Sequence, residues 1–285
     1  AISRRSDAVH TGCSATRMQR DFGIEPLGGR ALEGGPGQAD GAGGEAVRAV
    51  LLDAGNTLVF IDPHGVTEAL RQVGVDADVD GFWRAERVAR SVLVKRFREG
   101  SRRPEARIWR EYFATLYRAA GVSADLAPGV TERIKALHEA NRLWAHVPDG
   151  VAPALQALLD AGYRLAVISN ADGRVERILE REGLTPYMEF VLDSTVVGVE
   201  KPDPVIFHMA LERLGLGAGE CLYVGDLYDV DIVGARGAGL RAVLVDPYDL
   251  SADRDVDRIP SVAELPAYVA ALGGGGWAVG ESPGA

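Results

Sequence analysis

The segment LLDAGNTLV, residues 51–59, ends an apolar run in a single carboxylate and continues into a turn. Residues 47–52 are interrupted only by Arg48, so they predict a buried strand with Asp53 at its carboxyl end. An aspartate at a strand tip is well placed to act as a nucleophile or a metal ligand. Two residues later, where such a site often carries a second carboxylate, the chain has Gly55. The segment therefore predicts an active-site turn and raises the question of which group moves protons there.

On either side of this segment, short apolar runs alternate with amphipathic patterns. The apolar runs lack polar–apolar alternation, which is typical of parallel strands covered on both faces. We therefore expect an α/β fold, a doubly wound parallel sheet with its site at the carboxyl ends of the strands. The expected strands are 48–54, 164–170, 189–194, 221–226 and 241–246, and the expected helices between them are 150–162, 173–183, 203–215 and 231–239.

One long segment breaks this alternation. Residues 64–146 show helical periodicity and contain three of the four tryptophans, which we expect to pack in a small core of their own. They predict an all-helical cap domain, inserted after the first strand and covering the strand ends. Residues 1–45 are Gly-rich and are expected to be a disordered extension, and residues 273–285 a flexible tail. The α/β core then consists of residues 46–63 and 147–272.

Composition excludes several classes of protein. The chain has 285 residues, a formal net charge of −10 and two cysteines. The negative charge argues against a nucleic-acid binder, and no apolar run is long enough for a membrane span. Two distant cysteines and the lack of an apolar leader fit a cytoplasmic protein. Residues 84–110 carry ten Lys or Arg and three Glu, a field that could steer an anionic substrate but more often marks a solvated helix face.

Polar side chains gather at the carboxyl ends of the predicted strands. An acidic group there suits Mg²⁺, which prefers hard oxygen ligands. A hydroxyl and an ammonium suit the oxygens of a phosphoryl group, and a carboxylate can attack phosphorus to form an acyl phosphate. The residues concerned are Asp53, Thr57, Ser169, Asn170, Lys201, Asp226 and Asp231, with Asp229 as a weaker candidate.

Four motifs in order resemble those of the haloacid dehalogenase (HAD) superfamily. They are DAGNT (53–57), VISNADGR (167–174), VGVEKPDPVIFHMAL (197–211) and YVGDLYDVDIVGARGAGLRAVLV (223–245), and the resemblance covers about residues 47–270. It implies a Rossmannoid core with a helical cap of subfamily I, and Mg²⁺ as cofactor. It implies Asp53 as nucleophile and metal ligand, Asp226 as metal ligand, Ser169 and Lys201 as binders of the transferring group, and Asp231 as a supporting acid.

Gly55 departs from the family pattern. Phosphatases of the superfamily carry there a second aspartate, which protonates the leaving oxygen and then activates water. Loss of a positioned acid or base slows a reaction roughly 10²- to 10⁴-fold. The resemblance also implies that the backbone carbonyl at this position binds the metal, and Gly55 keeps that carbonyl. The sequence therefore predicts intact metal and phosphate binding with impaired proton transfer.

Several alternatives stay open at this point. The chain could be a catalytically weak HAD-like binding or regulatory protein. Dehalogenases of the superfamily also lack the second aspartate, but they are metal-free and replace the residue corresponding to Asp226. Phosphonate hydrolases use a cap lysine, for which Lys95 is the candidate, although its neighbours suggest a solvated face. His64 could replace the missing proton donor, but Asp62 and His64 fit a simple polar loop as well.

We therefore expect a Mg²⁺-dependent hydrolase, a phosphatase that acts on a small anionic, phosphorylated metabolite through an aspartyl-phosphate intermediate. Substrates with good leaving groups, such as acyl or aryl phosphates, should suffer least from Gly55. No nucleic-acid or membrane partner is expected, and the protein should be a monomer or a homodimer.

Overall fold

The computed structural model describes residues 46–101 and 106–272, so the expected extension at 1–45 and tail at 273–285 lie outside the described residues. A six-stranded parallel sheet organises the core, in the order β5-β4-β1-β6-β7-β8. This confirms the predicted doubly wound α/β fold. The strands are β1 (Ala49–Leu52), β4 (Arg164–Ser169), β5 (Val191–Asp193), β6 (Cys221–Gly225), β7 (Arg241–Val245) and β8 (Arg258–Ile259).

Each face of the sheet is covered by helices, because successive residues of a buried strand point to opposite sides. Val50 and Leu52 pack against α6 (Val151–Asp160), α7 (Val175–Arg181) and α11 (Leu265–Leu272). Ala49 and Leu51 pack on the other side, where α9 (Pro204–Leu214) and α10 (Val233–Gly237) lie. The short helices α8 (Ser194–Val197), η1 (Thr185–Tyr187), η2 (Ala218–Glu220) and η4 (Val262–Glu264) complete the connections. Apolar strands without alternation thus form a sheet that is buried on both faces.

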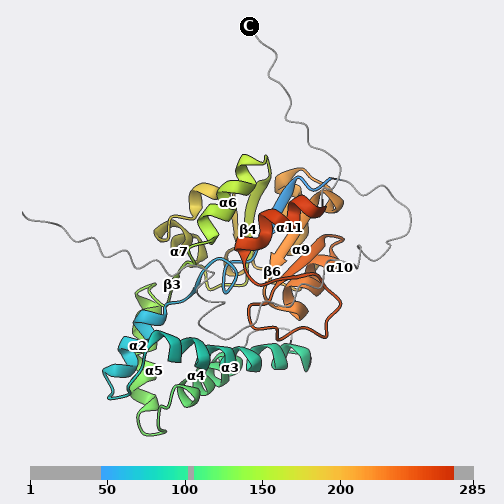
Figure 1. Cartoon of the computed structure of the whole chain (residues 1–285). Helices are drawn as coiled ribbons and strands as arrows, with labels where there is room; N and C mark the ends of the chain where they lie inside the picture. Colours follow the sequence, from blue (N-terminus) through green and yellow to red (C-terminus); the bar gives the residue numbers. More distant parts are fainter. Residues whose placement is uncertain (1–45, 102–105, 273–285) are drawn as a thin grey trace, which may run out of the picture.

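A layer of four helices lies beside the carboxyl ends of the strands (Figure 1). We call these helices the cap layer: α2 (Pro63–Arg71), α3 (Val79–Arg98), α4 (Ala106–Ala119) and α5 (Ala127–Glu139). Their buried apolar residues form a cluster separate from the two clusters of the core. Within the described ranges, no helix is long and apolar enough to cross a membrane.

The junction between the core and the cap layer differs from the sequence expectation. Strand β2 (Phe60–Ile61) pairs antiparallel with β3 (Trp144–His146), so the segment expected to be helical throughout ends in a strand. A two- or three-residue strand carries too little pattern to be separated from a loop by periodicity. This ribbon joins the turn after β1 to the segment that follows α5.

Candidate active site

Lys201 occupies the centre of the site. Its ammonium, 2% exposed, donates to Asp53 Oδ1 at 2.7 Å, to Asp231 Oδ1 at 2.8 Å and to the Tyr223 hydroxyl at 2.9 Å. The loop before α9 carries Lys201, and the Asn170 side chain fixes that loop. Asn170 Oδ1 accepts from the Lys201 amide at 2.8 Å, and Asn170 Nδ2 donates to the Lys201 carbonyl at 2.8 Å. The structure therefore gives Asn170 a positioning contact, while its predicted contact with phosphate stays a prediction.

Asp231 is held by four donors. Besides Lys201, the Tyr223 hydroxyl lies 3.0 Å from its Oδ1, and its Oδ2 accepts from the amides of Asp226 and Leu227 at 3.1 and 2.9 Å. The π-helical turn η3 (Tyr228–Ile232) places it there. A carboxylate with this many partners stabilises the loop and the lysine, so its contacts agree with the supporting role that the resemblance implies.

The charges of this buried group are strongly coupled. Burial raises the pKa of the Asp53 carboxyl, with Lys201 opposing the shift and Asp231 adding to it. Burial alone would lower the pKa of Lys201, but Asp231 and Asp53 outweigh it and raise that pKa above its usual value. Burial and the neighbouring Asp231 raise the pKa of Tyr223, so its hydroxyl keeps its proton. Lys201 is therefore a fixed positive charge beside the carboxylate expected to react.

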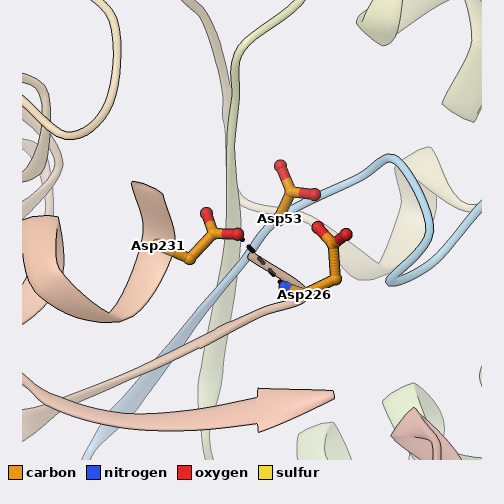
Figure 2. Close-up of side chains that lie close together, drawn as sticks. All are labelled: Asp53, Asp226 and Asp231. Carbon is orange, nitrogen blue, oxygen red and sulfur yellow. Dashed lines mark hydrogen bonds between the residues drawn. The ribbon is translucent and has the colours of Figure 1, made fainter. Parts of the chain in front are cut away.

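Asp53, Asp226 and Asp231 offer oxygens that lie within 4.8 Å of one another (Figure 2). This donor set of hard oxygens fits a divalent cation such as Mg²⁺. The close-up shows the Asp53 and Asp226 carboxylates next to each other, while a carboxylate oxygen of Asp231 accepts from the backbone amide of Asp226. Asp53 and Asp226 are therefore the side chains that fit a metal-binding role best.

The cap layer contributes a residue that sequence reasoning missed. Arg90 of α3 donates through Nη2 to Asp226 Oδ2 in a contact where both side chains are buried. Behind it on the same helix stands Glu86, whose Oε1 accepts from the Tyr112 hydroxyl at 3.2 Å. Burial raises the pKa of Glu86, and Arg90 opposes that shift. Lys201 thus pairs with Asp53 and Asp231, while Arg90 pairs with Asp226.

The remaining predicted residues have clear places. Ser169, at the end of β4, is buried and lines the cavity described below, as Asn170 does. Thr57 is 1% exposed, and within the described part of the chain its hydroxyl has no hydrogen-bond partner. The turn at 54–59 is closed by the Ala54 carbonyl, which accepts from the amides of Thr57, Leu58 and Val59. Thr57 is not among the residues that line the cavity, and its predicted contact with phosphate stays a prediction.

The weaker candidates lie away from the centre. Asp62 caps α2 by accepting from the amides of His64 and Gly65, and His64 is exposed. The Lys95 side chain is 71% exposed and pairs with Glu99 on the same helix face, which disfavours a Schiff-base role. Asp229, the weaker acidic candidate, pairs with Arg254 at 3.0 Å.

A large cavity opens over the strand ends, between the core and the cap layer. Its volume is about 1150 Å³, and Asp53, Lys201 and Asp226 line it from the core. From the cap layer come mainly apolar and aromatic side chains, among them Trp109 and Phe113. Two of the three tryptophans of this segment, Trp109 and Trp144, therefore line the cavity, and Trp83 packs inside the cap layer as expected.

Gly55 stands at the floor of this cavity, next to Trp144. A Cβ atom at position 55 would lie 3.6 Å from the Trp144 indole, an ordinary contact distance, and the backbone there does not have a positive φ. Packing therefore does not require glycine at position 55. The absence of a carboxylate there affects the chemistry of the site rather than its packing.

Comparisons with known proteins agree with this arrangement. The model of the haloacid dehalogenase-like hydrolases matches residues 47–239. The chain is 33% identical over 164 residues to haloacid dehalogenase-like hydrolase domain-containing protein 3 of Bos taurus. The aligned part covers 55% of this chain and 65% of that protein, a little under two thirds of its length. It is 31% identical over 240 residues to a ribulose-1,5-bisphosphate 5-phosphatase of Halopiger xanaduensis, covering 79% of this chain and 96% of that one.

A solved structure shares the same fold. The HAD-hydrolase YfnB of Bacillus subtilis, bound to magnesium, superimposes with a TM-score of 0.56 at 22% identity, covering 79% of this chain and 99% of that one. The parallel sheet, the order of the strand-end residues and the family match over most of the chain point the same way. The chain belongs to the haloacid dehalogenase-like hydrolases.

Proposed function

We propose that the protein is a Mg²⁺-dependent phosphatase that acts on a small phosphorylated metabolite through an aspartyl-phosphate intermediate on Asp53. The observation that carries the proposal is the contact of the Lys201 ammonium with Asp53, in a group where Asp226 and Asp231 complete the acidic cluster. The relative from Halopiger xanaduensis, which the chain matches over most of its length, is named a phosphatase.

The chemistry follows from the positions of these side chains. A carboxylate oxygen of Asp53 attacks phosphorus, and the bond to the leaving oxygen breaks. Water then attacks the phosphorus of the acyl phosphate, which releases inorganic phosphate and restores Asp53. Lys201 stabilises negative charge on the phosphoryl oxygens, and Ser169 on the cavity wall supplies a hydroxyl to them.

Asp53 and Asp226, with the Gly55 carbonyl, are the groups that would hold Mg²⁺. When bound, the ion supplies positive charge to the phosphoryl oxygens. Tyr223 and Asp231 keep Lys201 in place, and the cap layer limits access of water to the cavity. The residue at position 55 supplies no proton, so the reaction relies on water or on a weakly basic leaving group.

The proposal is tested by phosphate release from p-nitrophenyl phosphate and acetyl phosphate, with Mg²⁺ or with EDTA. We expect turnover that needs Mg²⁺ and that Asp53→Asn abolishes. Exposed Asp76→Asn serves as the matched control and should retain full activity. No release from any phosphate tested, with folded protein and Mg²⁺ present, would contradict the proposal and favour a binding protein.

A second candidate is hydrolysis of a carbon–halogen bond. Gly55 and the apolar cavity lining favour it, since a halide leaves without a proton. Its test is chloride release from 2-chloropropionate in EDTA, and metal-independent release would replace the phosphatase proposal.

A further inference from the structure

An aromatic wall runs along one side of the cavity. We define it by Trp144, Trp109, Phe113 and Tyr117, which all line the cavity. Trp109 lies 6.2 Å from Trp144 and 6.3 Å from Phe113, and Phe113 lies 6.1 Å from Tyr117, all between ring centroids. The three residues of α4 are spaced four apart, so they share one face of the helix. The wall is therefore a continuous surface of rings rather than scattered apolar residues.

This wall begins at the catalytic turn. The Trp144 indole lies where it would touch a side chain at position 55, two residues from Asp53. A phosphoryl group attacked by Asp53 would therefore lie close to Trp144, in a cavity that the rings line. Aromatic surfaces bind other rings by stacked and edge-to-face contacts. Trp144, the residue of the wall nearest to position 55, thus lies next to the place where the bond between phosphorus and the leaving oxygen would break.

Position 55 adds a second, independent observation. Without an aspartate there, the leaving oxygen departs as an anion or takes its proton from water. An alkoxide is about as basic as hydroxide, whereas a phenol has a pKa of about 10, so a phenolate is a far weaker base. A phenolate therefore leaves without a proton far more readily than an alkoxide.

We propose that the substrate is a phosphate monoester of an aromatic hydroxyl, an aryl phosphate whose ring stacks along the wall formed by Trp144, Trp109, Phe113 and Tyr117. The inference rests on the proposed phosphatase function. Asp53 forms the new P–O bond, the aryl O–P bond breaks, and its electron pair leaves on the aryloxide. In the second step water attacks phosphorus, the P–O bond to Asp53 breaks and restores the carboxylate, and a proton of that water passes to the aryloxide. Overall, aryl phosphate and water give the phenol and inorganic phosphate.

The test separates the ring from the leaving group with four phosphates. 2-Naphthyl phosphate has a ring and a good leaving group, and 2-naphthylmethyl phosphate has a ring and a poor one. Acetyl phosphate has a good leaving group and no ring, and glycerol 3-phosphate has neither feature. We expect 2-naphthyl phosphate to have the highest kcat/KM, acetyl phosphate a high KM, and the two alkyl esters a low kcat.

The ring contact is tested by Phe113→Ala. We expect KM for 2-naphthyl phosphate to rise about tenfold, because one stacked ring contact is lost, while KM for acetyl phosphate stays unchanged. Phe190→Ala is the matched control, since Phe190 is also partly buried but packs against the core, away from the cavity. Binding of the non-hydrolysable 2-naphthylmethylphosphonate, followed by tryptophan fluorescence, should weaken by a similar factor in Phe113→Ala alone.

The leaving-group argument is tested by Gly55→Asp. The new carboxyl should raise kcat for 2-naphthylmethyl phosphate by roughly 10²-fold and change kcat for 2-naphthyl phosphate much less. Equal kcat/KM for 2-naphthyl and acetyl phosphates, or a Phe113→Ala effect on both, would overturn the inference while leaving a phosphatase. Absence of turnover on all four compounds would instead overturn the proposed function, and phosphonate binding would then report on the wall by itself.

Discussion

At the scale of single residues, Asp53 is the proposed nucleophile, and its ionised form costs stability. Its carboxyl is buried, and burial raises its pKa above the unfolded value of 3.8 despite Lys201. The folded chain therefore holds this proton more tightly than the unfolded chain does. As the pH rises from the unfolded pKa through the folded pKa, this group lowers the free energy of unfolding. The proposed nucleophile is thus a residue that the fold tolerates rather than one that stabilises it.

This predicts a pH-dependent gain in stability for Asp53→Asn. The variant does not titrate at this position, so its free energy of unfolding relative to the wild type should increase as the pH rises through that window. Urea denaturation in EDTA, at intervals from about pH 4 to about pH 8, measures the difference. Asp76→Asn, at an exposed site, should run parallel to the wild type. A difference for Asp53→Asn that falls with pH would contradict the argument.

Gly225 is required by a close approach. A Cβ there would lie 2.4 Å from Asp231 Cγ, so Gly225→Ala must displace the Asp231 side chain from its four donors. We expect a loss of about 1–3 kcal/mol in the free energy of unfolding, as for overpacking of a core. Gly237→Ala is the control, because nothing lies within 4 Å of its Cβ position and Ala favours a helix. Equal urea midpoints for the two variants would refute this role.

At the scale of elements, α3 carries charge on its buried face. Phe82, Ala89, Leu93 and Phe97 form an apolar stripe, and Glu86 and Arg90 lie within it, four residues apart. Charged residues within an apolar stripe can be recognised in a sequence. They indicate ion pairs, because charged side chains are rarely buried without partners. The stripe therefore predicts that Arg90 has an acidic partner, but it does not identify that partner. Only the packing of α3 over the strand ends identifies Asp226.

Arg90 and Mg²⁺ should therefore compete. Both are cations drawn to Asp226, so Arg90→Met is expected to tighten Mg²⁺ binding several-fold, within the range of about 5- to 150-fold typical of coupled sites. Titration calorimetry with Mg²⁺ alone, without substrate, measures the change. Arg98→Met on the same helix removes an exposed pair with Asp253 and should leave Mg²⁺ affinity unaltered. Weaker binding in Arg90→Met would mean that Arg90 orients Asp226 for the metal.

At the scale of the whole molecule, the core and the cap layer have separate apolar clusters. If Mg²⁺ displaces Arg90, the cap layer loses an ion pair to the core. Hydrogen exchange in α3 should then become faster on addition of Mg²⁺, while η3 beside the site becomes more protected. Arg90→Met should show fast exchange in α3 with and without the ion. Slower exchange in wild-type α3 would show that the ion closes the two parts together.

The sequence predicts the large elements and the strand-end residues, because long apolar runs and their terminal carboxylates are local signals. Asp53, Lys201, Asp226 and Asp231 meet as the parallel topology requires. The β2–β3 ribbon and β8 are too short to give a periodic signal. The aromatic wall could not be predicted either, since rings at helical spacing are equally compatible with a cap core. Which side of α4 faces the cavity depends on tertiary packing.

The aromatic wall is divided between two parts of the chain. Trp144 packs against both clusters, and its carbonyl accepts from Arg181 of the core at 2.9 Å, whereas Trp109, Phe113 and Tyr117 belong to α4. Movement of α4 away from the strand ends would separate Trp109 from Trp144. A ligand ring that contacts both Trp109 and Trp144 would favour the closed arrangement, because it makes both contacts only when α4 lies against the strand ends. The same movement of α4 would then both select a substrate with a ring and exclude water from the cavity.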